Sequence, residues 1–152
     1  MIAVLQRVSR AEVRVEQDVV GKIGRGLVVL LGIERGDGQP DAEVLARKLL
    51  ALRIFPGRTP MDLSVKDVGG GCLVVSQFTL AGSTRKGNRP SFDRACDPAL
   101  AQTLYEYFAD LLRKDGITVA TGRFAAQMDV ELVNDGPVTF VLRARDGGLA
   151  GD

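Results

Sequence analysis

The sequence has 152 residues, with 20 basic and 19 acidic side chains, a formal net charge of +1 and no histidine. A chain of this length is expected to form one domain around one sizeable core, and its balanced charge indicates no general affinity for nucleic acid. The missing histidine excludes Ser-His-Asp and Cys-His catalysis, and two cysteines are too few for a four-thiolate zinc site. We therefore expect no metal and no cofactor, and any hydrolysis must proceed without a histidine base.

The start of the chain lacks the charged and then apolar layout of a signal peptide. Its longest apolar runs, such as 27–31, are far shorter than the roughly 20 residues that a membrane-spanning helix needs. Cys72 and Cys96 are expected to be reduced thiols. These features predict a cytoplasmic protein with no membrane association.

Short β-strands are expected at the beginning of the chain. The segments 2–8, 11–16 and 19–23 are predicted as short strands. In 11–16, Val13 and Val15 alternate with Glu12, Arg14 and Glu16, which is typical of a strand with one solvated face. The segment 27–31 is continuously apolar and flanked by glycines, which indicates a central strand covered on both faces. A further apolar strand is expected at 72–75.

Two helices are predicted to pack on this sheet. The first begins near Pro40, where a missing N–H costs little, and its buried leucines recur at helical spacing: Leu45, Leu49 and Leu52. The second has Asp97 as its N-cap and Gly116 just beyond its end. The apolar face of this second helix consists of Leu104, Phe108 and Leu111.

The last third of the chain returns to strands. Residues 128–132 alternate between apolar and acidic side chains, 134–137 read as a tight connection, and 138–142 resume a strand. The glycine-rich residues 143–152 are expected to form a flexible tail. The sequence thus predicts a single α+β domain over 1–142, with helices covering one side of its sheets.

Two segments carry polar groups that a purely structural role does not require. The first is Ser76-Gln77-Phe78-Thr79, which follows the apolar strand at the point where it leaves the core. In the ordinary interpretation, the two hydroxyls bond nearby backbone and Phe78 fills the core. In the functional interpretation, these four residues line a site at the end of the strand.

The second segment is Asn134-Asp135-Gly136-Pro137-Val138-Thr139. Its ordinary interpretation is a connection between two strands. Gly-Pro is unusual at that place because the proline removes an N–H donor. The residue pattern alone leaves both interpretations open.

At these two segments the chain resembles the D-aminoacyl-tRNA deacylases, editing enzymes with a Ser-Gln-Phe-Thr motif and a Gly-Pro-Val-Thr motif. Both motifs are intact at Ser76–Thr79 and Gly136–Thr139. The resemblance covers roughly 1–142 and also includes Met1–Val8, Arg89–Phe92, Thr121–Ala126 and Leu132–Asp135. It implies barrel-like or layered β-sheets with helices on one side, and a homodimer.

The resemblance also implies what the site does. A cis Gly136-Pro137 peptide would reach from one subunit into the pocket of the other, excluding an L-aminoacyl side chain while admitting a D-aminoacyl group or glycine. The pocket for the terminal adenosine and the ester carbonyl would be lined by Ser76, Gln77, Phe78 and Thr79, with Phe124 and Met128 nearby. Arg7 would brace the Gly-Pro turn. Thr79 and Thr139 would position groups rather than attack, and hydrolysis would be assisted by the RNA.

A local basic cluster is a candidate for contact with the tRNA. It consists of Arg85, Lys86, Arg89 and Arg94, and a solvated basic loop is the alternative explanation. Two other functions are left open: a non-catalytic module that binds a single-stranded RNA end, and an esterase with Ser76 as nucleophile. The esterase lacks a candidate base.

Overall fold

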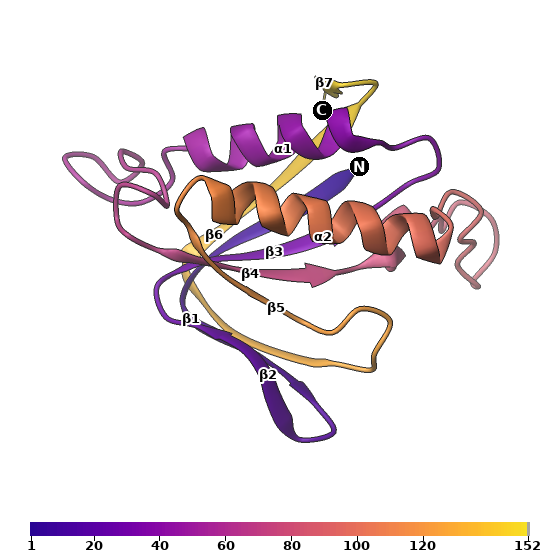
Figure 1. Cartoon of the computed structure of the whole chain (residues 1–152), viewed down its shortest axis with the longest axis horizontal. Helices are drawn as coiled ribbons and strands as arrows, with labels where there is room; N and C mark the ends of the chain where they lie inside the picture. The colour runs from indigo at the N-terminus through magenta and orange to yellow at the C-terminus, as the bar shows by residue number, and fades with distance from the viewer. Residues whose placement is uncertain (152) are drawn as a thin grey trace.

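The structure is a computed structural model that describes residues 1–151. Seven strands of this part of the chain form one mixed sheet in the order β5-β4-β3-β1-β6-β7, with β2 paired to β1 off this path. The sheet curls into a half-barrel, as Figure 1 shows. The strands are β1 (Ile2–Val15), β2 (Asp18–Ile23), β3 (Gly26–Gly32), β4 (Gly71–Ser76), β5 (Thr118–Thr121), β6 (Asp129–Arg145) and β7 (Gly148–Leu149).

The long strand β1 is the axis of the sheet. Its first half pairs antiparallel with β3, its second half pairs with β2, and β6 follows it on the other side. The segments 2–8 and 11–16, expected as two strands, therefore form one bent strand. A two-residue turn joins β1 to β2, and both of its residues, Glu16 and Gln17, have positive φ angles of 50° and 74°, as a twisted hairpin requires.

Helices α1 (Gln39–Ala51) and α2 (Pro98–Lys114) lie side by side on one face of the sheet (Figure 1). The predicted cap of α2 is confirmed, since the Asp97 carboxylate accepts the Leu100 N–H at 3.2 Å. Along its buried face, Leu112 is fully buried, whereas the predicted Leu111 is only partly buried. The main core fills the space between helices and sheet and includes Leu5, Leu27, Leu45, Leu49, Phe55, Leu104 and Phe108.

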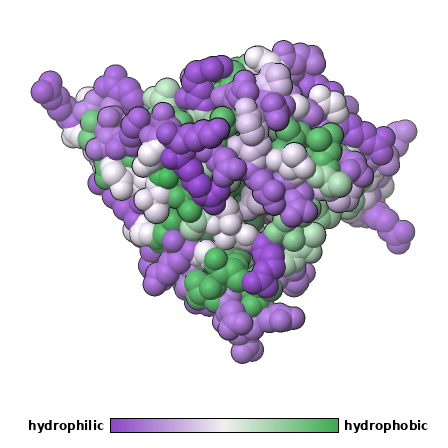
Figure 2. All heavy atoms as spheres, viewed as in Figure 1, coloured by the Kyte–Doolittle hydropathy of each residue, from purple (hydrophilic) through white to green (hydrophobic). Residues whose placement is uncertain are grey.

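A second apolar cluster lies on the opposite face of the sheet, inside its curl. Its buried members are Val8, Ala11, Val13, Ile23, Val28, Leu73 and Val75. The central strand β3 therefore contributes to both clusters, as its continuous apolar run predicted. Hydrophilic residues cover most of the surface seen in Figure 2, and hydrophobic ones appear in smaller areas between them. Within residues 1–151, no helix is long and apolar enough to cross a membrane.

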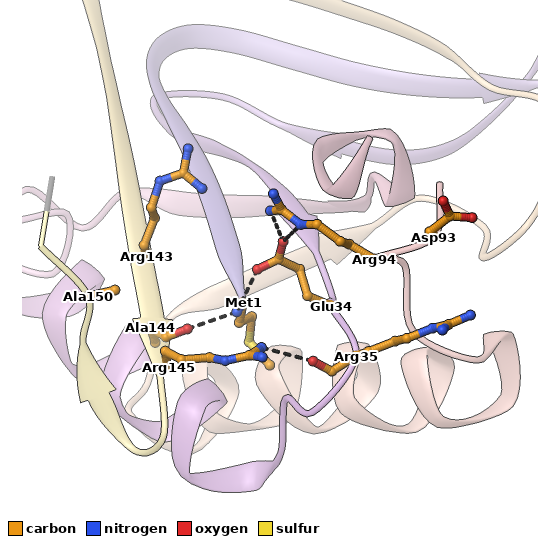
Figure 3. A pocket seen from close by; sticks show the side chains of 9 residues that line it. All are labelled: Met1, Glu34, Arg35, Asp93, Arg94, Arg143, Ala144, Arg145 and Ala150. Atoms are coloured by element: carbon orange, nitrogen blue, oxygen red, sulfur yellow. Dashed lines mark hydrogen bonds and ion pairs between the residues drawn. The ribbon is translucent and has the colours of Figure 1, made fainter. Parts of the chain in front are cut away.

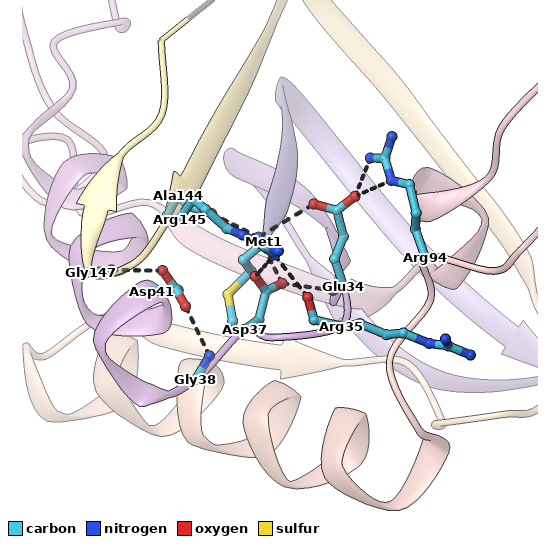
Figure 4. A network of polar contacts seen from close by, with 10 residues as sticks. All are labelled: Met1, Glu34, Arg35, Asp37, Gly38, Asp41, Arg94, Ala144, Arg145 and Gly147. Atoms are coloured by element: carbon cyan, nitrogen blue, oxygen red, sulfur yellow. Dashed lines mark hydrogen bonds and ion pairs between the residues drawn. The ribbon is translucent and has the colours of Figure 1, made fainter. Parts of the chain in front are cut away.

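The end of the chain differs from the expected flexible tail. Arg143 to Arg145 continue β6, and a turn with positive φ at Asp146 (53°) and Gly147 (73°) leads into β7. Asp-Gly favours this type of two-residue hairpin turn, a signal that the glycine-rich composition concealed. The hairpin is anchored on the start of α1, because Asp41 accepts the Gly147 N–H at 3.0 Å (Figure 4).

Candidate functional site

The structure places a hollow of about 770 Å³ at the end of β4, between the start of α2 and the loop from β5 to β6. It is lined by residues from four segments of the chain. These include Val75, Ser76, Gln77, Phe78, Phe92, Ala95, Cys96, Pro98, Ala101, Phe124, Ala125, Gln127, Met128 and Val130. We call this hollow the aromatic pocket.

The Ser-Gln-Phe-Thr segment forms one edge of the aromatic pocket because β4 ends there. Gln77 donates its N–H to the Leu31 carbonyl at 2.8 Å, and the chain then turns into the 3₁₀ helix η1 (Phe78–Ala81). Gly32 allows this turn to approach β3, since a Cβ there would lie 2.7 Å from the Leu80 Cβ. The Gln77 side-chain amide donates to the Thr79 hydroxyl, so these two polar groups hold each other beside the pocket.

The mouth of the pocket carries two exposed aromatic rings. Phe78 is 59% exposed and Phe92 is 39% exposed, and their ring centroids lie 5.1 Å apart. The interpretation in which Phe78 fills the core is therefore wrong. Exposed aromatic rings beside a hollow are suited to stacking on nucleobases, which expose a π-face whatever their sequence. Sequence reasoning did not select Phe92 as a site residue because it lies among charged loop residues.

Phe124 and Met128 line the opposite side of the pocket, in the loop between β5 and β6. The Phe124 ring lies 5.9 Å from that of Tyr105, whose hydroxyl donates to the Val74 carbonyl at 2.8 Å. Burial raises the pKa of Tyr105 to about 12. The phenol is therefore neutral at physiological pH and serves to support the pocket wall.

Cys96 is the only thiol lining the pocket among the described residues. Partial burial raises its pKa, and the nearby carboxylates of Asp97 and Asp37 raise it further. A thiol with a raised pKa stays protonated at neutral pH and is a poor nucleophile. Residues 1–151 contain no group of His, Cys, Asp and Glu side chains that could hold a metal ion.

The Gly-Pro segment is a bulge in β6, not the predicted connection between two strands. Gln6 pairs with Thr139 and Val8 pairs with Asn134, so four residues of β6 lie opposite the single residue Arg7. The cis Gly136-Pro137 peptide lies within this bulge, and both of its residues are exposed. Because strand pairing resumes on both sides, β6 is one strand interrupted by a bulge.

Arg7 holds the bulge from the β1 side. Its guanidinium is buried and donates to the carbonyls of Asp135 at 3.0 Å and Ile54 at 2.7 Å. The Asp135 carboxylate lies 3.3 Å from the same Nε. These contacts join β1, the bulge and the segment after α1. They place Arg7 against the Gly-Pro segment of the same chain.

Asn134 closes the bulge at its base. Its Oδ1 accepts the Val138 N–H at 2.8 Å, and its Nδ2 lies 3.1 Å from the Thr139 hydroxyl, to which it donates. The Gln6 amide donates to the same hydroxyl at 3.3 Å. Gly136 has φ +137°, and a Cβ there would lie 2.6 Å from the Val138 side chain. The bulge thus depends on a glycine and on side-chain hydrogen bonds.

The predicted site residues therefore form two groups. Ser76, Gln77, Phe78, Phe124 and Met128 line the aromatic pocket, with Thr79 beside it. The second group comprises Arg7, Gly136, Pro137 and Thr139 at the bulge, and none of these lines the pocket of the same chain.

The predicted basic cluster is divided as well. Arg85, Lys86 and Arg89 lie in an exposed loop that is closed by two hydrogen bonds between Ser83 and Ser91, close to Phe92 in the chain. The fourth member, Arg94, forms an ion pair with Glu34. The three loop residues and Arg94 therefore do not act as one cluster.

Comparison with known proteins gives consistent results. A family model described as D-Tyr-tRNA(Tyr) deacylase matches residues 4–143. The chain is 59% identical to the D-aminoacyl-tRNA deacylase of Anaeromyxobacter dehalogenans, over 95% of this chain and 98% of that one. It is 55% identical to the D-aminoacyl-tRNA deacylase of Salmonella typhimurium, over 94% of this chain and 99% of the other.

Two solved structures share the fold. One, described as c-Myc DNA Unwinding Element Binding Protein, is 41% identical and superimposes with a TM-score of 0.89, over 95% of this chain and 99% of the other. The second, described as a probable eukaryotic D-amino acid tRNA deacylase, is 20% identical with a TM-score of 0.76, over 92% and 97% of the two chains. The second match concerns the fold alone.

The hydrogen bonds of Asn134 make its substitution a direct test of the bulge. Asn134→Ala removes the acceptor of the Val138 N–H, and an unsatisfied, partly buried N–H costs about 1–3 kcal/mol. We expect the Val138 amide to exchange with deuterium faster, alongside a lower free energy of unfolding. Asn88→Ala, in the exposed loop, is the control and should change neither. Unchanged protection of Val138 would show that Asn134 does not hold the bulge.

Proposed function

Because the chain belongs to the D-Tyr-tRNA(Tyr) deacylase family, we propose that this hydrolase cleaves the ester bond of D-aminoacyl-tRNAs and of mischarged glycyl-tRNA, releasing free amino acid and tRNA. The observation that carries the proposal is the aromatic pocket itself. It combines an exposed pair of stacking rings with neutral polar groups, and its only thiol is kept protonated. This composition suits an adenosine bearing an ester that is already reactive.

The chemistry we propose needs no activated side chain. The terminal adenosine stacks at Phe78, and Ser76 and Gln77 hold the ester carbonyl near the start of η1, whose first N–H groups have no partner inside that short helix. Backbone N–H groups directed at the developing oxyanion and a water held in line supply the catalysis. The terminal ribose 2′-hydroxyl handles the proton, while Thr79 and Thr139 position the reacting groups.

Selection against L-aminoacyl groups is assigned to the Gly136-Pro137 bulge of a second copy. Gly136 and Pro137 are exposed and do not line the pocket of their own chain, and exposed apolar residues flank the bulge on β6: Val133, Phe140 and Val141. Exposed apolar area of this kind favours a partner. In the proposed homodimer, each bulge enters the other pocket and its backbone occupies the space that an L side chain would need.

The remaining contacts follow from the same arrangement. The exposed loop with Arg85, Lys86 and Arg89 lies next to the aromatic mouth along the chain and can meet the phosphates of the tRNA end. We infer that the enzyme acts in the cytoplasm, where aminoacyl-tRNAs are used. A module that binds single-stranded RNA ends without hydrolysis is the competing function, and the same two phenylalanines would serve it.

The proposal is tested by comparing release of D-tyrosine, L-tyrosine and glycine from matched charged tRNAs. We expect rapid release of D-tyrosine and of glycine, and slow release of L-tyrosine, because only the L side chain meets the bulge. The measurement is the rate of radiolabelled amino acid release at saturating enzyme. Equal release of D- and L-tyrosine would contradict the chiral selection, and tight binding without any release would favour the RNA-binding module.

The role of the RNA hydroxyl is tested separately. Thr79→Ala should retain most of the D-tyrosine release, because Thr79 positions groups rather than attacks. A D-tyrosyl-tRNA ending in 2′-deoxyadenosine should release its amino acid at least about 100-fold more slowly, which is the usual effect of losing an acid–base group. Single-turnover rates measure both. Loss of activity in Thr79→Ala together with full activity on the deoxy substrate would assign the chemistry to the protein instead.

A further inference from the structure

A second hollow, of about 430 Å³, lies at the end of the sheet where the two ends of the chain meet. Four of its lining residues are arginines, and they come from three segments of the chain (Figure 3). The full lining is Met1, Glu34, Arg35, Asp93, Arg94, Arg143, Ala144, Arg145 and Ala150. We call this hollow the arginine hollow.

The arginine hollow and the aromatic pocket share a wall. The wall consists of residues 33–35 and 92–96, which are joined by hydrogen bonds from Arg35 N–H to the Arg94 carbonyl (2.9 Å) and from Cys96 N–H to the Ile33 carbonyl (3.1 Å). Ile33 and Cys96 line the aromatic pocket, while Arg35 and Arg94 line the arginine hollow.

The acids of this region are already engaged within the protein. Asp37 is buried and accepts from the Met1 amino group at 2.7 Å and from the Glu34 N–H at 2.7 Å (Figure 4). Glu34 pairs with Arg94, and Asp93 accepts from the Ser91 hydroxyl at 2.7 Å. Four arginines and the Met1 amino group thus face three carboxylates, those of Glu34, Asp37 and Asp93, and the region keeps a net positive charge.

That remaining charge resides on two guanidinium groups. Arg145 is held by Asp37 and by the Arg35 carbonyl, whereas the side chains of Arg35 and Arg143 have no hydrogen-bond or ion-pair partner within residues 1–151. Arginine is always charged and its planar fork of donors matches phosphate oxygens. Arg143 is presented by the C-terminal hairpin, which is anchored on α1 through Asp41. The side chain is thus mounted on an ordered element.

We propose that the arginine hollow binds backbone phosphates of the RNA strand whose 3′-terminal adenosine occupies the aromatic pocket. The proposal rests on the proposed function, since it takes the strand to continue from one hollow across the shared wall into the other. Arg35 and Arg143 are the phosphate ligands, and the ligand class is a phosphodiester chain. The C-terminal hairpin, which the composition suggested to be a tail, thereby contributes to substrate binding.

The test measures binding of uncharged tRNA to the full chain over a range of KCl concentrations. Arg35→Gln and Arg143→Gln should each weaken binding several-fold at low salt and reduce the slope of log Kd against log salt by about one. The control is Arg47→Gln, an exposed arginine on α1 that lines neither hollow, and it should leave both quantities unchanged.

A substrate without phosphate separates binding from damage to the aromatic pocket. All three variants should hydrolyse 3′-O-D-tyrosyl-adenosine at the wild-type rate. The proposal is overturned if Arg35→Gln and Arg143→Gln keep the wild-type salt slope, if Arg47→Gln loses as much affinity, or if hydrolysis of the short ester falls along with tRNA affinity. If the wild-type enzyme hydrolyses neither 3′-O-D-tyrosyl-adenosine nor D-tyrosyl-tRNA, the proposed function is rejected, whatever the salt dependence of binding.

Discussion

The arrangement of the site depends on Arg7, one buried arginine that faces four residues of the neighbouring strand. Its guanidinium satisfies the carbonyls of Asp135 and Ile54, so the bulge of β6 is tied both to β1 and to the segment that follows α1. Removing one partner of a buried, charged hydrogen bond costs more than the bond itself contributes. Arg7 therefore stabilises the bulge at which the Gly136-Pro137 backbone is exposed.

The second constraint is chemical. The chain has no histidine, and the one thiol at the aromatic pocket has its pKa raised by burial and by neighbouring carboxylates. A site of this composition can hold and orient an ester but offers no side chain suited to activate a nucleophile. The proposed hydrolysis accordingly uses backbone groups and the ribose of the substrate, and the proposed selectivity uses backbone shape. In both respects the protein acts by positioning.

Much of the fold could be predicted from the sequence because local signals were consistent with the final packing. The cap at Asp97 and the continuous apolar run of β3 are examples. The bulge at Asn134–Val138 could not be predicted, because the same residues suit a tight turn between two strands. Only the pairing of β6 with β1 on both sides of the segment shows that it is a bulge. Phe92 lines the pocket although it lies in a loop among charged residues, so its local sequence gives no sign of the site. The hairpin turn at Asp146-Gly147 lies in a glycine-rich segment whose composition resembles that of a flexible tail.

The central claim is that the bulge of one chain completes the pocket of another. It is tested most directly in heterodimers purified with two different tags. One chain carries Gln77→Ala and Phe78→Ala, which remove its pocket. The other chain carries Gly136→Ala, whose new methyl group must displace the bulge. The only intact pocket then belongs to the Gly136→Ala chain. We predict that these heterodimers release D-tyrosine over L-tyrosine as selectively as the wild type, because the intact pocket receives an unaltered bulge from its partner. The Gly136→Ala homodimer should be less selective, because both of its bulges are displaced. If the heterodimer shows the same low selectivity as that homodimer, the account is contradicted.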